Sequence, residues 1–249
     1  MVSTLADKTA LVTGASSGLG AHFAQVLAQA GARVILTARR QDALEDVAQK
    51  ITAARGTAST MRLDVTDRAS VDAMSGILAD VDILVNNAGL VRTGPALEQT
   101  EADWDVVLDT NLKGMFLMAQ AAARAMRASK RGGSIINIAS ILALRQAGAV
   151  LPYAVSKAGV IQLTKTMALE VARFGIRVNA LAPGYLDTDL NGGFWESEAG
   201  RAMIKRIPQQ RLGRLEDLDA PLLLLASDAS SYMTGSVLVV DGGHLVSTL

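Results

Sequence analysis

Short apolar runs rich in β-branched residues recur along the chain and alternate with longer helical patterns. The short runs are apolar at successive positions, which is typical of strands buried on both faces of a parallel sheet. They predict strands at 9–13, 33–37, 58–63, 81–86, 133–139, 176–180 and 236–240. The longer patterns predict helices at 18–30, 41–54, 68–78, 101–129, 152–174 and 215–226.

This regular alternation of strands and helices favours one fold class. Successive strand–helix–strand units need right-handed crossovers, so we expect an α/β protein with a doubly wound parallel sheet of seven strands, the Rossmann arrangement. Residues 1–249 would form a single domain. One segment, 185–214, breaks the alternation; it is rich in Gly, Asp, Glu and Arg and carries Phe194 and Trp195. Because ligands bind beyond the carboxyl ends of such strands, we expect a substrate lid there, with a plain surface loop as the alternative.

The composition excludes several classes of function. The chain has 24 basic and 24 acidic side chains, and a net charge of zero argues against a nucleic-acid or membrane partner. It has no cysteine, which excludes disulfides and thiolate catalysis, and its two histidines, His22 and His244, do not suggest a metal site. It shows no signal-peptide pattern and no apolar run of about 18 residues, so we expect a soluble cytoplasmic protein.

A glycine-rich turn follows the first predicted strand and opens the first predicted helix. Glycines at such a turn allow a tight backbone and close approach of a pyrophosphate, which the unpaired N–H groups of the helix can bind. A turn without a ligand is the alternative, but the position at the first crossover favours dinucleotide binding. The residues expected to bind the phosphates are Gly14, Ser16, Ser17, Gly18, Leu19 and Gly20.

The end of the second predicted strand bears on the choice of cofactor. An acidic residue here would bind the ribose 2′-hydroxyl of NAD and repel a 2′-phosphate, but this chain has Ala38. Arg39 and Arg40 follow, and their charge suits a phosphate dianion. We therefore expect NADP as the preferred cofactor, with NAD still possible; the alternative is that both arginines are solvated residues at a helix start.

A tyrosine and a lysine lie near the start of the helix predicted at 152–174. Tyr153 and Lys157 are four residues apart and share one helix face. A free tyrosine has a pKa of about 10. Because an ammonium group close to it favours the phenolate, Tyr153 can exchange a proton with a substrate. Such pairs also occur by chance. Ser140, at the end of the fifth predicted strand, and Asn111, a polar residue in an apolar helix, make the assignment more specific.

These motifs, in this order, resemble the short-chain dehydrogenase/reductase family over residues 8–243. The resemblance implies an NAD(P)-dependent enzyme that moves a hydride between a nicotinamide ring and an alcohol or carbonyl carbon. Asn111, Ser140, Tyr153 and Lys157 match the catalytic tetrad of the family. In that tetrad the serine holds the substrate oxygen, the lysine binds the nicotinamide ribose, and the asparagine keeps a water that completes a proton path.

The resemblance also implies further cofactor contacts. Asp64 and Val65 are similar to the adenine-binding pair of the family, and Thr188 matches a hydroxyl that contacts the nicotinamide amide. The other residues implied to contact the cofactor are Asn87, Ala88, Gly89, Tyr153, Lys157, Pro183, Gly184 and Leu186.

The substrate pocket is expected to be apolar with few charges, which suits a hydrophobic or acyl ketone better than a sugar phosphate. The overall pattern is similar to bacterial 3-oxoacyl-thioester reductases, so the expected reaction is reduction of a ketone, including a 3-oxoacyl thioester, or its reverse. An NAD-dependent alcohol or polyol dehydrogenase and a non-catalytic nucleotide-binding scaffold are the alternatives. The candidate pocket residues are Ser140, Leu142, Gln146, Leu151, Tyr185, Leu190, Phe194 and Trp195.

Two features concern partners. Carrier-protein reductases of the family place basic residues at the ends of the long helices; Arg131 fits one such place, but Phe174 stands where a second arginine is common, and Arg173 is its possible substitute. The helices at 101–129 and 152–174 carry more apolar surface than one sheet face can cover. Family members bury these helices against a partner, and the 242–246 tail resembles one that closes a tetramer, so we expect a homo-oligomer, either a dimer or a tetramer.

Overall fold

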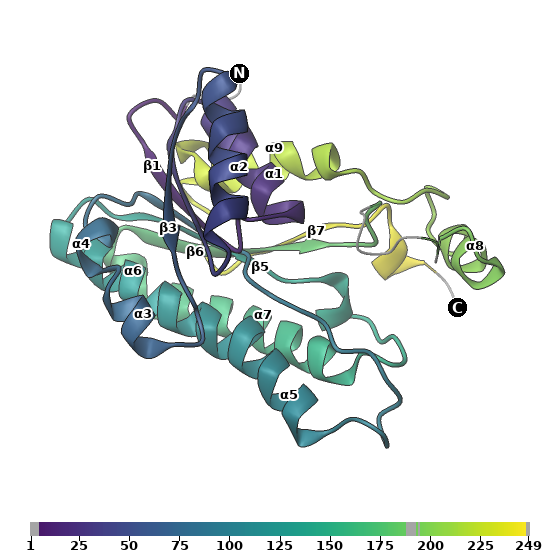
Figure 1. The fold of residues 1–249 in the computed structure, drawn as a ribbon. Helices are drawn as coiled ribbons and strands as arrows, with labels where there is room; N and C mark the ends of the chain where they lie inside the picture. Colours follow the sequence, from purple (N-terminus) through teal and green to yellow (C-terminus); the bar gives the residue numbers. More distant parts are fainter. Residues whose placement is uncertain (1–4, 188–192, 194, 248–249) are drawn as a thin grey trace.

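The computed structural model describes residues 5–187, 193 and 195–247. Its centre is a seven-stranded parallel sheet with the strand order β3-β2-β1-β4-β5-β6-β7, and helices cover both faces (Figure 1). The order reverses at β1 (Thr9–Thr13), which pairs with β2 (Arg33–Ala38) on one side and with β4 (Ile83–Asn86) on the other. The predicted fold class, a doubly wound Rossmann sheet, is confirmed.

The remaining strands agree with the predicted ones to within a few residues. They are β3 (Thr57–Arg62), β5 (Gly133–Ile138), β6 (Ile176–Pro183) and β7 (Val237–Val240). The sixth strand runs beyond its predicted end at residue 180 because β7 pairs with it as far as Pro183, which lies opposite Val240. All strands are parallel, so their carboxyl ends meet at one edge of the sheet, where ligands bind in folds of this kind.

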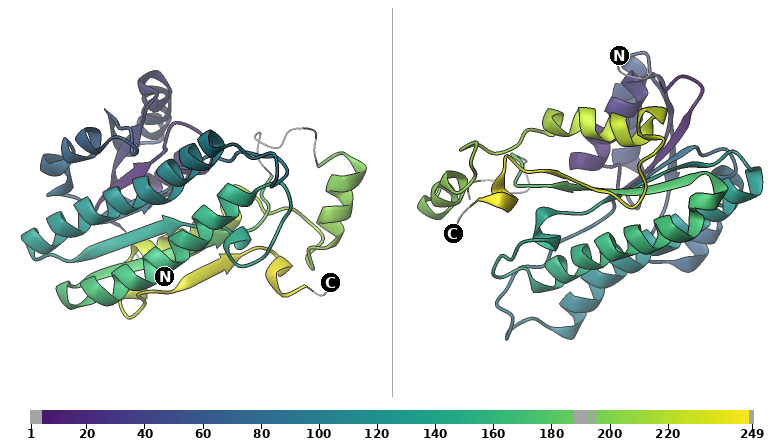
Figure 2. Two further views of the ribbon diagram at one scale, coloured as in Figure 1. Left: turned by 90° about the horizontal axis from the view of Figure 1, so that it is seen from below. Right: turned by 180° about the vertical axis from the view of Figure 1, so that it is seen from behind.

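The two faces of the sheet are buried against separate groups of helices, as Figure 2 shows from two further directions. Leu11 belongs to the apolar cluster on one face and the adjacent Val12 to the cluster on the other, as expected for a doubly covered sheet. One face carries α1 (Gly18–Gln29), α2 (Gln41–Ala53) and α9 (Asp219–Ala226). The other carries α3 (Arg68–Asp72), α4 (Ser75–Leu78), α5 (Glu101–Leu108), α6 (Met115–Ser129) and α7 (Leu151–Val171).

Two predicted helices are interrupted. The helix expected at 68–78 is divided into α3 and α4, and Gly76, a poor helix former, lies in the second piece. The helix expected at 101–129 contains a π-helical segment, Asp109–Gly114, between α5 and α6. At its end, a Cβ on Gly114 would lie 2.7 Å from a Val65 methyl group, so glycine allows the segment to pack closely against the strand end.

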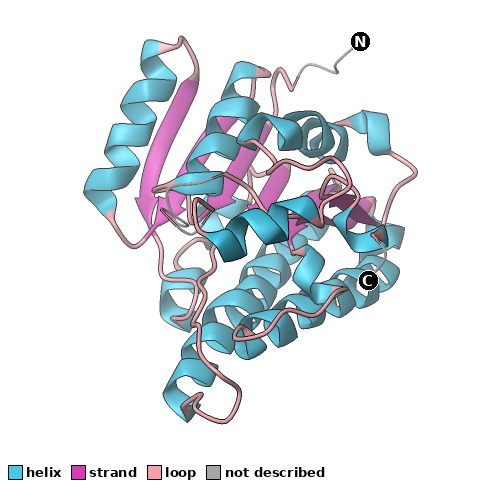
Figure 3. Cartoon of the chain, turned by 90° about the vertical axis from the view of Figure 1, so that its right-hand side faces the viewer, coloured by secondary structure: helices cyan, strands magenta, loops and turns pink. Residues whose placement is uncertain are grey.

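The segment 185–214 contains a helix that the sequence did not predict, α8 (Glu198–Lys205), which Ser197 caps by accepting a hydrogen bond from the Gly200 N–H. Figure 1 places α8 beside the C-terminal turn, His244–Val246, beyond the carboxyl ends of the strands. Figure 3, seen from that side, shows loops and short helices in front of the sheet. Three expected site residues, Thr188, Leu190 and Phe194, lie outside the described residues.

Two kinds of feature are absent from the described residues. Within 5–187, 193 and 195–247, no helix combines the length and the apolar character that crossing a membrane requires. The same part of the chain holds no group of three or more His, Cys, Asp or Glu side chains placed to bind a metal ion.

Candidate active site

The glycine-rich turn between β1 and α1 is tight on one side and open on the other. A Cβ at Gly20 would lie 2.3 Å from the Gly14 carbonyl oxygen, and a Cβ at Gly14 would lie 2.9 Å from Ala88 Cα. Gly18, by contrast, has a φ of +53° and would meet nothing within 4 Å. Ser17 precedes the helix but makes no side-chain cap, so the helix N–H groups stay available. A tight turn with an open side at a helix N-terminus fits a pyrophosphate.

The ends of β1 and β4 are joined by hydrogen bonds beneath this turn. The Thr13 hydroxyl accepts from the N–H groups of Asn87 and Ala88, both at 3.0 Å, and the Asn87 side chain donates back to the Thr13 carbonyl at 3.0 Å. Gly89 packs closely against the Asn111 side chain, since a Cβ at Gly89 would lie 3.2 Å from the Asn111 Oδ1. The side chain of Asn87 therefore supports the turn, and small residues after it keep the chain close to β1.

Arg40 folds back over the glycine-rich turn. Its guanidinium donates hydrogen bonds of 3.0 Å to the hydroxyls of both Ser16 and Ser17. Arg40 is also the residue that precedes α2, as the alternative interpretation held, yet its side chain points to the expected phosphate site. Ala38, the position where an acidic residue would select NAD, is thus close to the positive charge of Arg40.

The expected adenine pair lies at the end of β3. Partial burial pushes the pKa of Asp64 upward, but hydrogen bonds from Thr66 and the charges of Arg39 and Arg62 outweigh it and hold that pKa below its usual value. Both Thr66 bonds go to one carboxylate oxygen, Oδ1. Val65 is buried and packs against Gly114. Asp64 is therefore an ionised acceptor fixed at the nucleotide side of the sheet.

The strand β5 and the helix α7 bring together Ser140, Tyr153 and Lys157. The helix begins at Leu151 with a proline in its first turn, a position where proline is favoured. Lys157 lies one turn further on; its Nζ is 5.6 Å from the centre of the Tyr153 ring and donates to the Ile138 carbonyl at 2.7 Å. The side chain is buried, and burial lowers the pKa of Lys157 to about 8.

Ser140 holds its hydroxyl next to the phenol. Its Oγ accepts a hydrogen bond from the Leu142 N–H at 3.1 Å, which fixes the side chain at the start of a short 3₁₀ turn. Burial raises the pKa of Tyr153, a hydrogen bond with the Ser140 hydroxyl opposes this, and Tyr185 adds to the rise. The phenol is consequently protonated near neutral pH, which is the form that can donate a proton to a carbonyl oxygen.

Asn111 lies in the π-helical segment and is completely buried. Its Oδ1 accepts from the Leu90 N–H at 2.8 Å, and its Nδ2 donates to the Leu90 carbonyl at 2.8 Å and to the Ser156 hydroxyl at 3.1 Å. Ser156 in turn donates to the Tyr153 carbonyl at 2.7 Å. The side-chain amide of Asn111 is thus fully hydrogen-bonded to protein groups. A water on the proton path would therefore be held by the backbone of Asn111.

Ser156 is a residue that the sequence interpretation missed. It connects Asn111 to the first turn of α7. The sequence signal was a small polar residue directly before Lys157, and in the structure its side chain is completely buried.

The expected substrate pocket is aromatic on one side. The Tyr185 ring meets the Trp195 ring edge-on at 5.4 Å and lies 5.5 Å from the His244 ring. Of the other expected pocket residues, Leu142 is half-buried, and Gln146 and Leu151 are exposed. Arg145, which the sequence interpretation did not include, lies in the same loop, and its charge bears on Tyr185.

The expected cofactor residues at the end of β6 and after it also make contacts that hold the fold together. Pro183 ends the strand, and a Cβ at Gly184 would lie 2.7 Å from Asp241 Cα, so glycine permits this close crossing. Leu186 is buried in the apolar core and forms a parallel bridge with Gly213. A nucleotide contact from Leu186 would therefore use its backbone.

A doubly wound parallel sheet with a glycine-rich turn at its first crossover and a tyrosine–lysine pair at its carboxyl edge defines a nicotinamide-nucleotide oxidoreductase. Comparison with known sequences agrees. The sequence model of a family described as "Enoyl-(Acyl carrier protein) reductase" matches residues 14–244. Gluconate 5-dehydrogenase of Gluconobacter oxydans is 39% identical, over 98% of this chain and 97% of that protein. The 3-oxoacyl-[acyl-carrier-protein] reductase FabG of Thermotoga maritima is 38% identical, over 97% and 99%.

Solved structures agree as well. A short-chain type dehydrogenase/reductase from Mycobacterium marinum superposes with a TM-score of 0.91 at 44% identity, covering 98% of this chain and 97% of that one. A gluconate 5-dehydrogenase from Burkholderia cenocepacia, in complex with NADP and tartrate, gives 0.93 at 36% identity over 99% and 98%. The chain belongs to the short-chain dehydrogenase/reductase family, as the sequence predicted, and it is an NAD(P)-dependent oxidoreductase.

Proposed function

We propose that this enzyme reduces a ketone to a secondary alcohol with NADPH, or catalyses the reverse reaction, and that Tyr153 is the proton donor or acceptor. The observation that carries the proposal is the convergence of three side chains at the sheet edge: the Ser140 hydroxyl at the phenol, and the Lys157 ammonium 5.6 Å from the Tyr153 ring centre. NADPH, when bound, supplies the hydride. The intact site disfavours a non-catalytic scaffold.

Each of these side chains has a distinct task in the proposed reaction. The Ser140 hydroxyl, fixed by the Leu142 N–H, holds the substrate oxygen beside the phenol. Tyr153, whose pKa is raised further by burial and which is therefore protonated near neutral pH, donates its proton to that oxygen as the alcohol forms. Lys157 is still largely charged at neutral pH and favours the resulting phenolate. The backbone around Asn111 would hold the water that returns the proton.

NADP is the proposed cofactor because a cation occupies the place expected for a 2′-phosphate. Arg40 is held over the turn by two serine hydroxyls, and Ala38 leaves no acidic side chain to repel the phosphate. The neighbour from Burkholderia cenocepacia, which was solved with NADP, agrees with this choice. NAD stays possible, since Ser17 is not basic.

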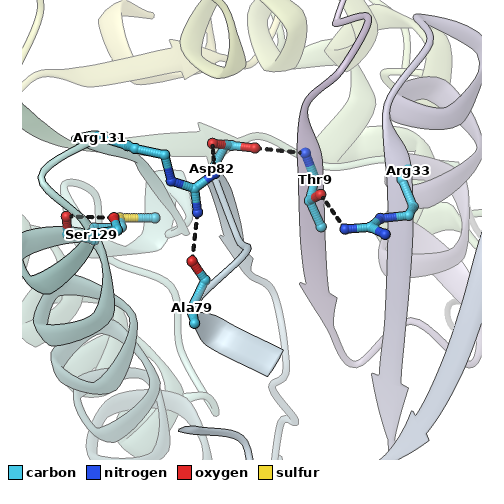
Figure 4. A network of polar contacts seen from close by, with 7 residues as sticks. Thr9, Arg33, Ala79, Asp82, Ser129 and Arg131 are labelled. Carbon is cyan, nitrogen blue, oxygen red and sulfur yellow. Dashed lines mark hydrogen bonds and ion pairs between the residues drawn. The ribbon is translucent and has the colours of Figure 1, made fainter. Parts of the chain in front are cut away.

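A carrier-protein substrate finds less support in the basic residues of the long helices. Arg131 donates at 2.5 Å to the Ala79 carbonyl and lies 3.4 Å from Asp82, whose other oxygen accepts from the Thr9 N–H at 2.9 Å (Figure 4). This network joins the amino ends of β1 and β4, at the sheet edge opposite Ser140. Arg131 therefore has a structural task, and we favour a small ketone over a carrier-bound one.

Two further basic residues lie at the same end of the long helices. The guanidinium groups of Arg127 and Arg173 lie over the Phe174 ring, 5.3 and 4.8 Å from its centre. Arg173, the residue proposed to substitute for a missing arginine, is therefore engaged with an aromatic ring.

The remaining expectations belong to the same proposal. Segment 185–214, with α8, acts as a lid on one domain formed by the whole chain. Exposed apolar side chains on α5, α6 and α7, including Trp104, Phe116 and Leu169, support a homodimer or homotetramer. A cytoplasmic location would suit a family member of this kind.

A substrate panel tests the proposal. Purified enzyme is mixed with NADPH or NADH and a series of ketones, diketones and acyl thioesters, and the loss of reduced-nucleotide absorbance is followed. We expect turnover with at least one ketone and a higher rate with NADPH. A chain that binds NADPH but turns over no ketone, and oxidises no alcohol with NADP, would be a scaffold.

A further inference from the structure

Arg145 lies in the loop between Ser140 and α7, at the side of the active site that faces the C-terminal turn. Its Nη1 donates to the His244 carbonyl and, at 2.9 Å, to the Ser247 hydroxyl. Both acceptors are neutral oxygens. Among the residues that the structure describes, Arg145 forms no ion pair with a carboxylate, so its charge is not neutralised at a half-buried position.

The acidic residue of the C-terminal turn does not provide the missing partner. Asp241 uses both carboxylate oxygens within the turn: one accepts from the Gly243 N–H at 2.9 Å and the other from the Leu245 N–H at 2.6 Å. These bonds shape the turn that presents the His244 carbonyl to Arg145. The guanidinium is therefore held in place by backbone and hydroxyl groups while its charge stays available to a ligand.

His244 provides a second, independent sign of a ligand. Its side chain is only 5% exposed, and its Nδ1 is a buried atom without a hydrogen-bond partner in the described part of the chain. Burial, followed by the charge of Arg145, lowers the pKa of His244, so the ring is neutral at neutral pH. A neutral imidazole can donate one hydrogen bond, and buried polar atoms of folded proteins normally have a partner.

Tyr185 connects this pair to the reacting atoms. Its ring lies 5.5 Å from the His244 ring. Burial raises the pKa of Tyr185 and the charge of Arg145 opposes that rise, while Tyr185 itself raises the pKa of Tyr153. Tyr185 thus neighbours both the His244 ring and the proposed proton donor.

We propose that Arg145 and His244 bind a carboxylate of the substrate, so that the enzyme acts on keto acids and the corresponding hydroxy acids. The inference rests on the proposed function and specifies its substrate class. A planar guanidinium matches the two oxygens of a carboxylate, and the His244 ring can add a third hydrogen bond. This replaces the apolar, charge-poor pocket that the sequence predicted. A neutral ketone or an acyl thioester would leave the guanidinium without its counter-charge.

The test compares acids with their own methyl esters. Keto acids with the ketone in the α, β or γ position, and the methyl ester of each, are reduced by the wild-type enzyme with NADPH. We expect at least one acid to exceed its ester about tenfold or more in kcat/KM, since a charge-assisted hydrogen bond is worth about a factor of ten or more. Esters that match or exceed their acids throughout would overturn the proposal.

Two variants separate charge recognition from support of the turn. Arg145→Gln should remove the preference for the acid and leave the ester rate within about twofold. Ser247→Ala, which removes a partner of Arg145 but keeps the guanidinium, should retain the preference. If both variants lowered the acid and ester rates equally, Arg145 would serve only to hold the C-terminal turn, and the inference would be wrong.

A binding measurement keeps the two proposals distinguishable. If no ketone is turned over, the proposed function fails, and titration calorimetry with the same acids still tests the site. Binding of an acid to the wild-type enzyme that is lost in Arg145→Gln would keep the carboxylate site. Equal binding to both proteins, or binding to neither, would overturn it.

Discussion

The ammonium of Lys157 lies 5.6 Å from the centre of the Tyr153 ring and donates its hydrogen bond to a backbone carbonyl, that of Ile138. Among the described residues, Lys157 forms no ion pair with a carboxylate. This places a buried cation and the half-buried Tyr153, the proposed proton donor, on one helix face, and the first two predictions follow from that pair.

Tyr153→Phe removes the proposed proton donor and little else, because the ring keeps its packing. We expect kcat to fall by at least about a hundredfold, the usual contribution of a general acid or base, with NADPH binding nearly unchanged. Steady-state rates and fluorescence titration with NADPH measure the two effects. An unchanged kcat would show that another group carries the proton.

Lys157→Met should abolish turnover yet stabilise the folded chain near neutral pH. Burial lowers the pKa of Lys157 from 10.5 to about 8, so keeping the ammonium buried costs about 3 kcal/mol below pH 8. The variant also leaves the Ile138 carbonyl without its partner, a loss of about 1–3 kcal/mol, so the net gain is about 1 kcal/mol.

The sign of this effect depends on pH. The cost of burying the charge is fully present below the folded pKa of about 8 and disappears as the pH rises toward the unfolded value of 10.5. The stabilisation by Lys157→Met should therefore decrease through that window. Denaturant unfolding of both proteins at neutral and alkaline pH measures this difference in stability. If the advantage of the variant over the wild type grew with rising pH, the burial argument would be wrong.

Arg40→Ala tests the contact with the 2′-phosphate. Loss of a charge-assisted hydrogen bond should raise the KM for NADPH by about tenfold to a hundredfold, while the KM for NADH changes little. Arg68→Ala is the matched control, because Arg68 is an exposed arginine paired with Asp72 on α3. Equal changes for both nucleotides would mean that Arg40 supports the turn and does not select the cofactor.

Gly18→Ala tests the open side of the glycine-rich turn. Alanine at a φ of +53° costs about 1–2 kcal/mol, but the methyl group itself meets no protein atom within 4 Å. If the pyrophosphate occupies that space, NADPH affinity should fall by more than tenfold while the fold persists. Gly76→Ala, in α4 and equally unhindered, should leave NADPH binding unchanged and raise stability by about 0.5–1 kcal/mol.

Ser156→Ala tests the link between Asn111 and the start of α7. The alanine leaves one Asn111 N–H and the Tyr153 carbonyl without the hydroxyl, which should lower stability by about 1–3 kcal/mol. As a positioning residue, Ser156 should affect kcat and leave the KM for NADPH unchanged, and Ser156→Thr should restore the rate. A loss of stability with full kcat would limit the hydroxyl to a structural role.

The sheet and the core of the site could be predicted because local signals carry them. Buried strands have apolar residues on both faces, and in a parallel sheet every strand ends at the same edge, so Ser140 and Tyr153 were expected to meet there. The glycine-rich turn, proposed to bind the pyrophosphate, was recognisable because its glycines follow β1 directly. These relationships depend on short stretches of chain whose positions the topology determines.

Other features depend on contacts that no local pattern reveals. Arg145 meets His244 and Ser247 about a hundred residues away, and nothing near Arg145 in the sequence indicates a charged pocket wall. The sequence therefore predicted an apolar pocket, a prediction to which the proposed carboxylate site would add a positive charge. Likewise, α8 was not predicted because its eight residues, although amphipathic, are few and polar on average, and only the Ser197 cap marks its start.

The π-helical segment Asp109–Gly114 acts as a phase shift between two helices that look like one in the sequence. A π turn contains one more residue than an α turn, so the side chains after it are rotated by roughly 100° relative to an unbroken helix. α5 can therefore face α7 while α6 faces α3 and α4. Removing a single residue from this segment would restore a regular helix and turn one of these faces away from its neighbours, which makes the residue count between α5 and α6 as important as the residues themselves.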